Sequence, residues 1–417
     1  MLGSGGPDGA PYREFVLSRI AAAHRIVLVD DAVPDWTAPY VAGHIPADLS
    51  DTAAVAAAVK EVVPDNRITG VMTYLEHHVV AAAEIAQLLD LPGSSPEAMA
   101  ACRDKALTRQ RLADARPAVP SAHARQATSA DRAVEHANAI GYPVVVKPRS
   151  LAASVGVVRA DNDAEVRAAY EQARAGTLHG LEQYGPRGVL VEEFLEGTEI
   201  SVETAVLGPG QAHMLAVTRK APSPAGTTQE SGHIVDANDP LLDDEDLAHV
   251  ISAAVGALGL TCGVLCIEVM LTVSGPRIVE INGRLGGDLL PLLVQHALGI
   301  DLAQIAAALA TGTTPQLRAT RSRAAGIRFA YPTVTGTLDH LRFPPGLTAL
   351  PFVDRVVLSR SPGEHVVAPP HSTIADRLAH WVVTADNAPD CELLLDEVAT
   401  HLDITVNRPV RAASCSR

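Results

Sequence analysis

The chain has 417 residues and a formal net charge of -15 at pH 7, and 47% of its residues are hydrophobic while 19% are charged. This length is too great for one ordinary core and indicates two or three domains, and the mean hydropathy of +0.14 argues against global disorder. The acidic balance, without any run of basic residues, argues against nucleic acid and anionic membrane as main partners, because Lys and Arg patches recruit both. We therefore expect a folded cytoplasmic enzyme that acts on small molecules.

The sequence lacks the pattern of a secretory signal or a membrane span. Residues 1–11 are Gly-rich, contain Asp8 and have no apolar core, unlike a signal peptide. The longest apolar stretch, 289–310, is interrupted by polar residues such as Gln295 and Asp301, which argues against a spanning helix.

Cysteine and lysine usage is informative. The five cysteines form no Cys-x-x-Cys pair and have no histidines at zinc-site spacing, so reduced thiols are expected; they are Cys102, Cys262, Cys266, Cys391 and Cys415. Lysine occurs only as Lys60, Lys105, Lys147 and Lys220, and arginine supplies the other cations. A chain that avoids lysine so strongly is expected to keep it where a compact ammonium group is needed.

The first part of the chain alternates strands and helices. Residues 25–29 and 68–74 are short apolar runs typical of buried strands. Residues 53–63 and 79–89 are Ala-rich helical patterns, and the Leu-Pro-Gly at 91–93 stops the second one. This alternation predicts a parallel, doubly wound α/β unit that ends near residue 95.

The rest of the chain has a different texture, with short strands, helices and loops rich in small residues. A helix that contains Arg103-Asp104-Lys105 begins at residue 96. Strands are expected at 144–146, 157–158, 188–195 and 199–207, helices at 130–139, 164–173, 372–378 and 391–401, and loops at 150–156 and 221–232. No internal repeat is present.

These elements predict a multidomain protein of α/β and α+β class. The expected division is an N-terminal doubly wound α/β domain at 1–100, a central domain at 101–318 and a small C-terminal α+β domain at 319–417. Residues of about 118–190 are expected to form a lid subdomain of the central domain.

A predicted hairpin around residues 273–275 brings two carboxylates together. If these three residues form the loop, Glu268 lies directly across from Glu280, whereas a two-residue loop would put the two on opposite faces. Asn282 lies on the same face as Glu280. Buried carboxylates so close repel one another, so a cation is expected there, and such oxygen ligands suit Mg²⁺. The alternative is that one glutamate faces solvent.

At these residues the sequence resembles a known family. The stretch Val279-Glu280-Ile281-Asn282-Gly283-Arg284 is similar to the metal-binding strand of ATP-grasp enzymes, and Gly286-Gly287-Asp288 extends the likeness. Similar residues in the same order place the resemblance over about 70–310. The segment 147–157 is most similar to that of L-amino acid ligases, which join two amino acids into a dipeptide. Loops of the family usually carry more glycines, where this chain has Ala152, Ala153 and Ser154.

The resemblance implies an ATP-grasp fold and a role for each site residue. Phosphates would be bound by Lys105, Lys147 and Ser154, with Lys220 on the γ-phosphate. Adenine would contact Glu192 and the backbone of Glu193 and Leu195, and Glu199 would accept the ribose hydroxyls. Two Mg²⁺ ions, for which Mn²⁺ can substitute, would bind Glu268, Glu280 and Asn282. Substrate would contact His233, Arg284, Gly286, Gly287 and Asp288, with Arg284 and Lys147 catalytic.

The implied reaction joins a carboxylate, most simply of an amino acid, to an amine through an acyl phosphate, giving ADP and phosphate. Two alternatives remain: another ATP-grasp carboxylase or ligase, of the biotin-carboxylase or purine-pathway type, and a nucleotide-binding scaffold without catalysis. Members of the superfamily are often homodimers. The sequence leaves open the identity of both substrates, the pathway, the oligomeric state and the roles of Glu76, His77 and His78.

Overall fold

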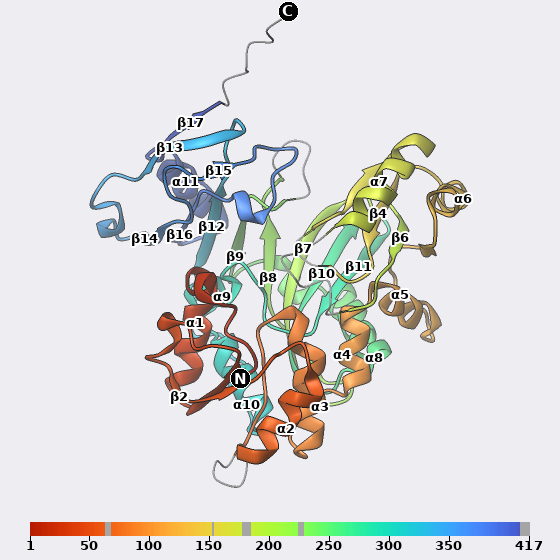
Figure 1. The fold of residues 1–417 in the computed structure, drawn as a ribbon, viewed down its shortest axis with the longest axis horizontal. Helices are drawn as coiled ribbons and strands as arrows, with labels where there is room; N and C mark the ends of the chain where they lie inside the picture. The colour runs from red at the N-terminus through yellow and green to blue at the C-terminus, as the bar shows by residue number, and fades with distance from the viewer. Residues whose placement is uncertain (63–67, 152–153, 177–184, 224–228, 409–417) are drawn as a thin grey trace, which may run out of the picture.

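The computed structural model describes residues 1–62, 68–151, 154–176, 185–223 and 229–408. Parts of two predicted loops, at 152–153 and 224–228, lie outside the described residues, as do Cys415 and the end of the helix predicted at 53–63. Figure 1 shows an N-terminal unit, a central sheet, a small layer of strands with α6 and α7 to one side, and the C-terminal segment to the other.

The N-terminal unit is built on a parallel strand pair, β1 (Ile26–Asp30) and β2 (Val41–Pro46), with helices α1 (Ala10–Ala21), α2 (Thr52–Val62) and α3 (Val79–Leu88) around it. The strand predicted at 68–74 is wrong. Its place beside β1 is taken by the chain start, since Val29 N–H donates to Met1 O at 2.9 Å and Gly3 N–H to Val29 O at 2.9 Å. Residues 68–74 contact this segment through one backbone bond, from Leu2 N–H to Met72 O, and through side-chain bonds from Thr73 to Leu2 O and from Tyr74 to Ser4 O.

The single helix predicted from residue 96 is two helices, α4 (Pro96–Arg103) and α5 (Lys105–Asp114). Asp104 separates them in an extended conformation, and its side chain accepts hydrogen bonds from the N–H groups of Ala106 and Leu107. An aspartate in this position caps a new helix rather than continuing the old one. The break places Lys105 in the first turn of α5, where it faces the central sheet.

The layer to one side of the central sheet is a four-stranded antiparallel sheet of order β3-β6-β4-β5, covered by α6 and α7 (Figure 1). Its elements are β3 (Ala124–Ala127), α6 (Ala130–Ile140), β4 (Val144–Pro148), β5 (Val158–Ala160), α7 (Asp163–Ala175) and β6 (Val189–Glu193). Buried Val144, Val146 and Val191 form its core with small residues of both helices. The alternating pattern of β4 therefore leaves Lys147 at the strand end that faces the cavity.

The central sheet has eight strands in the order β11-β10-β7-β8-β9-β12-β16-β14. The strands are β7 (Thr198–Val206), β8 (Ala212–Lys220), β9 (Gly232–Asp236), β10 (Gly263–Thr272), β11 (Gly275–Asn282), β12 (Ala324–Ala330), β14 (Val353–Leu358) and β16 (Ala379–Ala385). Two cores lie against it: one contains α8 (Glu245–Leu258), the other α1, α9 (Leu290–Leu298) and α10 (Leu302–Ala310).

The C-terminal segment continues this sheet, since three of the eight strands come from it. Its remaining strands, β13 (Gly336–Arg342), β15 (His365–Val366) and β17 (Asp403–Asn407), form a separate three-stranded sheet. The helix predicted at 391–401 is α11 (Ala388–Ala399), which begins earlier because Asn387 caps it. The helix predicted at 372–378 is wrong: only a 3₁₀ turn, Ile374–Asp376, forms before β16 begins.

No single helix among the described residues has the length and hydrophobicity to cross a membrane. Helices α9 and α10 reach that threshold only as a pair, bent by 109° at the break between them.

Candidate active site

The β10–β11 hairpin sets the Glu268–Glu280 pair, although its loop differs from the prediction. Thr272 pairs with Gly275, so the loop has two residues rather than three. Such a loop alone would move Glu280 out of register with Glu268. A β-bulge between Glu268 and Val269 restores the match, because β11 contributes one extra residue there, and Glu268 does pair with Glu280. Two departures from the regular hairpin cancel.

The charges at this pair are unbalanced. Burial raises the pKa of Glu268 to about 8; Lys220 opposes this shift, but the negative charges of Glu199 and Glu280 add to it. Burial also acts on Glu280, but an ion pair with Lys105 at 2.9 Å outweighs it and holds the pKa of Glu280 below its usual range. Asn282 is buried and donates its side-chain N–H to Cys266 O at 3.3 Å, which leaves its amide oxygen as the ligand atom. This donor set fits a hard divalent cation.

A cationic excess lies on the facing side of the cavity. Glu192 is buried and accepts Lys147 at 2.7 Å and Arg109 at 3.0 Å. Burial lowers the pKa of Lys147, whereas the two cations hold the pKa of Glu192 below its usual range despite its burial. Two nearby cations act on the pKa of Glu192, whereas Lys147 shares that one carboxylate with Arg109. One positive charge therefore remains beside the cavity, as an anion such as phosphate requires.

Lys220 has the opposite surroundings. Its ammonium lies 2.5 Å from Glu199, 2.8 Å from Glu230 and 3.5 Å from Glu268. These three carboxylates raise its pKa well above the usual value in spite of burial. In this arrangement Lys220 neutralises carboxylates rather than facing an open anion site.

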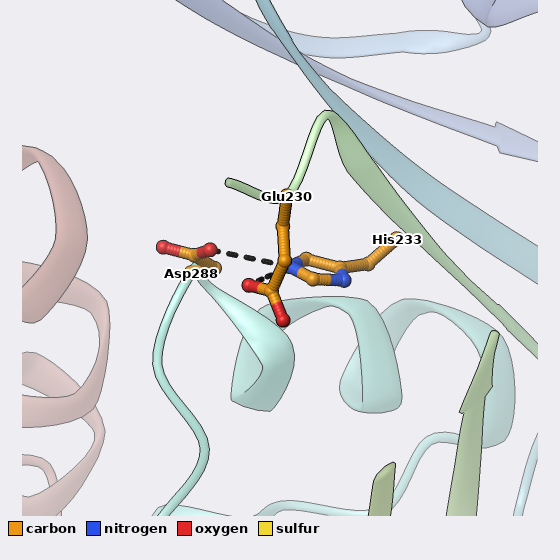
Figure 2. Close-up of side chains that lie close together, drawn as sticks. All are labelled: Glu230, His233 and Asp288. Atoms are coloured by element: carbon orange, nitrogen blue, oxygen red, sulfur yellow. Dashed lines mark hydrogen bonds and ion pairs between the residues drawn. The ribbon is translucent and has the colours of Figure 1, made fainter. Parts of the chain in front are cut away.

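Figure 2 shows a second charged group, Glu230, His233 and Asp288, whose side chains converge from β9, the loop before it and the loop before α9. His233 Nε2 lies 3.2 Å from Asp288 and 3.5 Å from Glu230. Burial alone would lower the pKa of His233, but the two carboxylates raise it to about 9. The three ligand-type atoms lie within 4.8 Å of one another.

The protein's own cations already neutralise this group. Arg377 donates two hydrogen bonds to Asp288, at 2.7 and 2.9 Å, and its guanidinium lies 3.6 Å from the centre of the Phe329 ring. Lys220 pairs with Glu230. We therefore read the group as a charge network that fixes His233, not as a metal site. The sequence prediction named His233 and Asp288 but missed Glu230, three residues before the histidine, and Arg377, which gave no local signal.

The loop after β11 carries Arg284 and is held in place by contacts with Glu76 and Glu203. Arg284 pairs with Glu76 at 2.8 Å. Gly286 N–H donates to the buried Glu203 at 3.2 Å, and a Cβ on Gly286 would lie 2.4 Å from a Glu203 oxygen. Asp288, with φ of 50°, and the following residue both adopt the left-handed region, which is uncommon for residues other than glycine. The sequence gave no reason to single out Glu203, because it fits the alternation of polar and apolar residues along β7.

All the predicted site residues line one cavity of about 640 Å³, together with Glu76, Arg109 and Arg377. Ser154 adopts a left-handed φ of 56°, a conformation that glycine would favour. The side chain of Glu193 is turned to Arg277, at 2.7 Å, and its N–H donates to His123 O. The backbone N–H of Glu193 is therefore already bonded within the protein. Lys105 also donates to Leu151 O at 2.7 Å, which ties α5 to the small-residue loop.

Comparison with known families decides the classification. Residues 140–291 match the ATP-grasp domain, residues 21–93 the ATP-grasp N-terminal domain, and residues 328–407 the L-amino acid ligase C-terminal domain 2. This chain belongs to the ATP-grasp superfamily. The fold class expected from the sequence is confirmed, and the ATP-grasp chain resembles the carboxylate-amine ligases of the L-amino acid ligase family.

Individual relatives agree with this placement. The ATP-grasp chain is 29% identical to the uncharacterized protein y4rH of Sinorhizobium fredii over 96% of its own length and 81% of that protein. It is 31% identical to carnosine synthase 1 of Homo sapiens, but the match covers 62% of this chain and only 32% of that one. Its fold is that of the L-amino acid ligase from Bacillus licheniformis, with a TM-score of 0.79, 22% identity, and coverage of 95% and 96%.

Proposed function

We propose that this ATP-grasp protein joins the carboxylate of one amino acid to the amine of another, through an acyl phosphate, with release of ADP and phosphate. The observation that carries the proposal is the opposition of two charge imbalances across one cavity. The cationic side of Lys147 and Arg109 faces the carboxylate pair Glu268 and Glu280. Such a cavity suits a nucleoside triphosphate with its divalent cation.

The nucleotide would lie along the edge of the smaller sheet. Lys105, Lys147 and Ser154 would bind phosphates, and Glu192, whose Oε1 is buried without a hydrogen-bond partner among the described residues, would accept the adenine amino group. The backbone of Glu193 and Leu195 would contact the base edge. Glu199 would accept the ribose hydroxyls. We keep Lys220 as a γ-phosphate contact only for a closed state, in which it would leave its three carboxylates.

The divalent cations, Mg²⁺ or Mn²⁺, would be held by Glu268, Glu280 and Asn282, and we propose two of them. When bound, they supply charge neutralisation at the phosphate oxygens. The raised pKa of Glu268 supports this assignment, since its carboxylate is left without a sufficient counter-charge in the protein alone. The neighbouring Lys105 compensates only Glu280.

The remaining steps use side chains that do not become covalently attached to substrate. The substrate carboxylate attacks the γ-phosphate in line, with Lys147 placed at the phosphates. A neutral amine then attacks the activated carbonyl. Arg284, a fixed guanidinium 2.8 Å from Glu76, stabilises the oxyanion that develops. His233 and Asp288 would position the substrates, together with the backbone of the loop at 286–287.

We propose the domain division at 1–100, 101–318 and 319–417 with a lid at about 118–190 that closes over the site and excludes water. Homodimer formation is proposed as the assembly. The substrates themselves are small molecules, and the choice of two amino acids is supported by the C-terminal domain match.

Phosphate release with all pairs of amino acids, ATP and Mg²⁺, followed by mass spectrometry of the products, tests the proposal. An amide product with stoichiometric ADP is expected. Oxygen-18 in the substrate carboxylate should appear in the released phosphate, because that oxygen attacks the γ-phosphorus. AMP with labelled carboxylate oxygen would refute the acyl phosphate route, and turnover with bicarbonate alone would point to a carboxylase.

A further inference from the structure

Arg13, on α1, is the exception among the cations of the cavity. Every other Lys or Arg that lines it has a carboxylate at 3.0 Å or less; these are Lys105, Arg109, Lys147, Lys220, Arg284 and Arg377. Arg13 also lines the cavity, yet it has neither an ion pair nor a hydrogen bond to any residue that the structure describes. A half-buried guanidinium without a partner is costly unless a ligand supplies one.

The chain holds Arg13 in this place. A Cβ on Gly5 would lie 2.7 Å from both Cδ and Nε of Arg13. The Arg13 side chain therefore packs against Gly5 in space that any larger residue would fill. Gly5 has a φ of 94°, which also favours glycine. Both the close contact with Arg13 and the positive φ favour glycine at position 5, and this glycine leaves room for the guanidinium to reach the cavity from α1.

The charged neighbours of Arg13 show which end of the cavity it serves. Burial lowers its pKa and the charge of Arg284 lowers it further, whereas Tyr74 and Asp288 oppose the shift. Arg13 therefore lies close enough to the proposed oxyanion residue, Arg284, and to Asp288 of the His233 network for their charges to act on it.

From this placement we infer that Arg13 binds a carboxylate carried by the amine substrate, which makes that substrate an amino acid and the product a dipeptide with a free terminal carboxylate. The inference rests on the proposed function. The carboxylate that is activated must face the phosphates, and it loses its charge on reaction. An amino acid that acts as the amine keeps its own carboxylate, and Arg13 is the free cation next to the reacting carbonyl. The planar fork of arginine suits this ligand.

The test uses the full chain with its best amino acid pair from the phosphate-release screen. The amine partner is offered as the free amino acid and as its carboxamide, to wild type, Arg13→Gln and Arg13→Lys. The matched control is Arg25→Gln, since Arg25 is exposed and lies outside the cavity. Thermal unfolding verifies folding, and Arg13→Gln should not lower Tm, because it removes an unpaired charge.

Arg13→Gln should raise KM for the free amino acid by at least about tenfold, as for loss of a charge-assisted contact. The KM values for ATP and for the acyl partner should change by less than about twofold. With the carboxamide, wild type and Arg13→Gln should be equally poor, and Arg13→Lys should recover part of the loss. Arg25→Gln should match wild type.

An equal effect of Arg13→Gln on the acid and the carboxamide would overturn the inference, as would a raised KM for the acyl partner instead, which would mean that Arg13 reads a second carboxylate there. If wild type used amines without a carboxylate as fast as amino acids, the inference would also be overturned, while the proposed acyl-phosphate ligation of a carboxylate to an amine would stand. Absence of amine-dependent phosphate release with every pair would instead refute the proposed function.

Discussion

Replacing Glu203 by glutamine should remove a pH dependence of stability that this one buried group creates. Its side chain is 0% exposed, and burial raises its pKa from 4.5 to about 7. Because one pKa unit corresponds to about 1.36 kcal/mol, this shift changes the free energy of unfolding by on the order of 3 kcal/mol across its range. Glutamine keeps the shape and the acceptor for Gly286 N–H.

The sign follows from the direction of the shift. The folded state holds the Glu203 proton more tightly than the unfolded chain, so its contribution is fully present below pH 4.5 and is lost as the pH rises through about 7. Wild type therefore loses stability over that interval on account of this group, and Glu203→Gln does not. Above pH 7 the difference between the two proteins should stay constant.

Thermal unfolding at intervals from pH 5 to pH 8.5 measures this difference. The Tm of Glu203→Gln minus the Tm of wild type should rise by a few degrees between pH 5 and pH 7.5. Glu84→Gln is the control, because Glu84 is exposed on α3. A difference that does not vary with pH would show that Glu203 does not titrate in this range and would refute the argument from burial.

Three further predictions concern the site. Glu280→Gln should abolish turnover at ordinary Mg²⁺ while Tm stays within a few degrees of wild type, since it removes a charge without changing shape; wild-type phosphate release would contradict the metal assignment. Lys147→Ala should lower kcat/KM for ATP by a factor that corresponds to a loss of at least about 2 kcal/mol of transition-state stabilisation. Lys60→Ala, at an exposed residue, should leave kcat/KM unchanged. An unchanged ATP titration of Lys147→Ala would exclude Lys147 from the phosphate site. Gly286→Ala should lower both Tm and activity, because its Cβ would meet a carboxylate oxygen at 2.4 Å, whereas Gly287→Ala, with no atom within 4 Å, should fold normally; equal Tm values would contradict this packing.

Several features were predictable because they depend on short-range patterns. The position of Lys147 next to the end of β4, and the order of acidic residues along β10 and β11, follow from the period of a strand. The pairing of Glu268 with Glu280 was predicted correctly, but from an incorrect loop length. A bulge compensated for the shorter turn, and neither feature has a reliable signal in a single sequence.

The sequence by itself therefore determined the local elements and the residue types that suit phosphates and a divalent cation, because hydrophobic periodicity and turn chemistry act over a few residues. Only the tertiary structure decided that C-terminal strands extend the central sheet, that Arg377 reaches Asp288 across 89 positions, and that Arg13 alone among the cavity's described Lys and Arg residues lacks a carboxylate. Ion pairs between distant segments depend on how whole layers pack against one another, and local sequence patterns do not predict that packing.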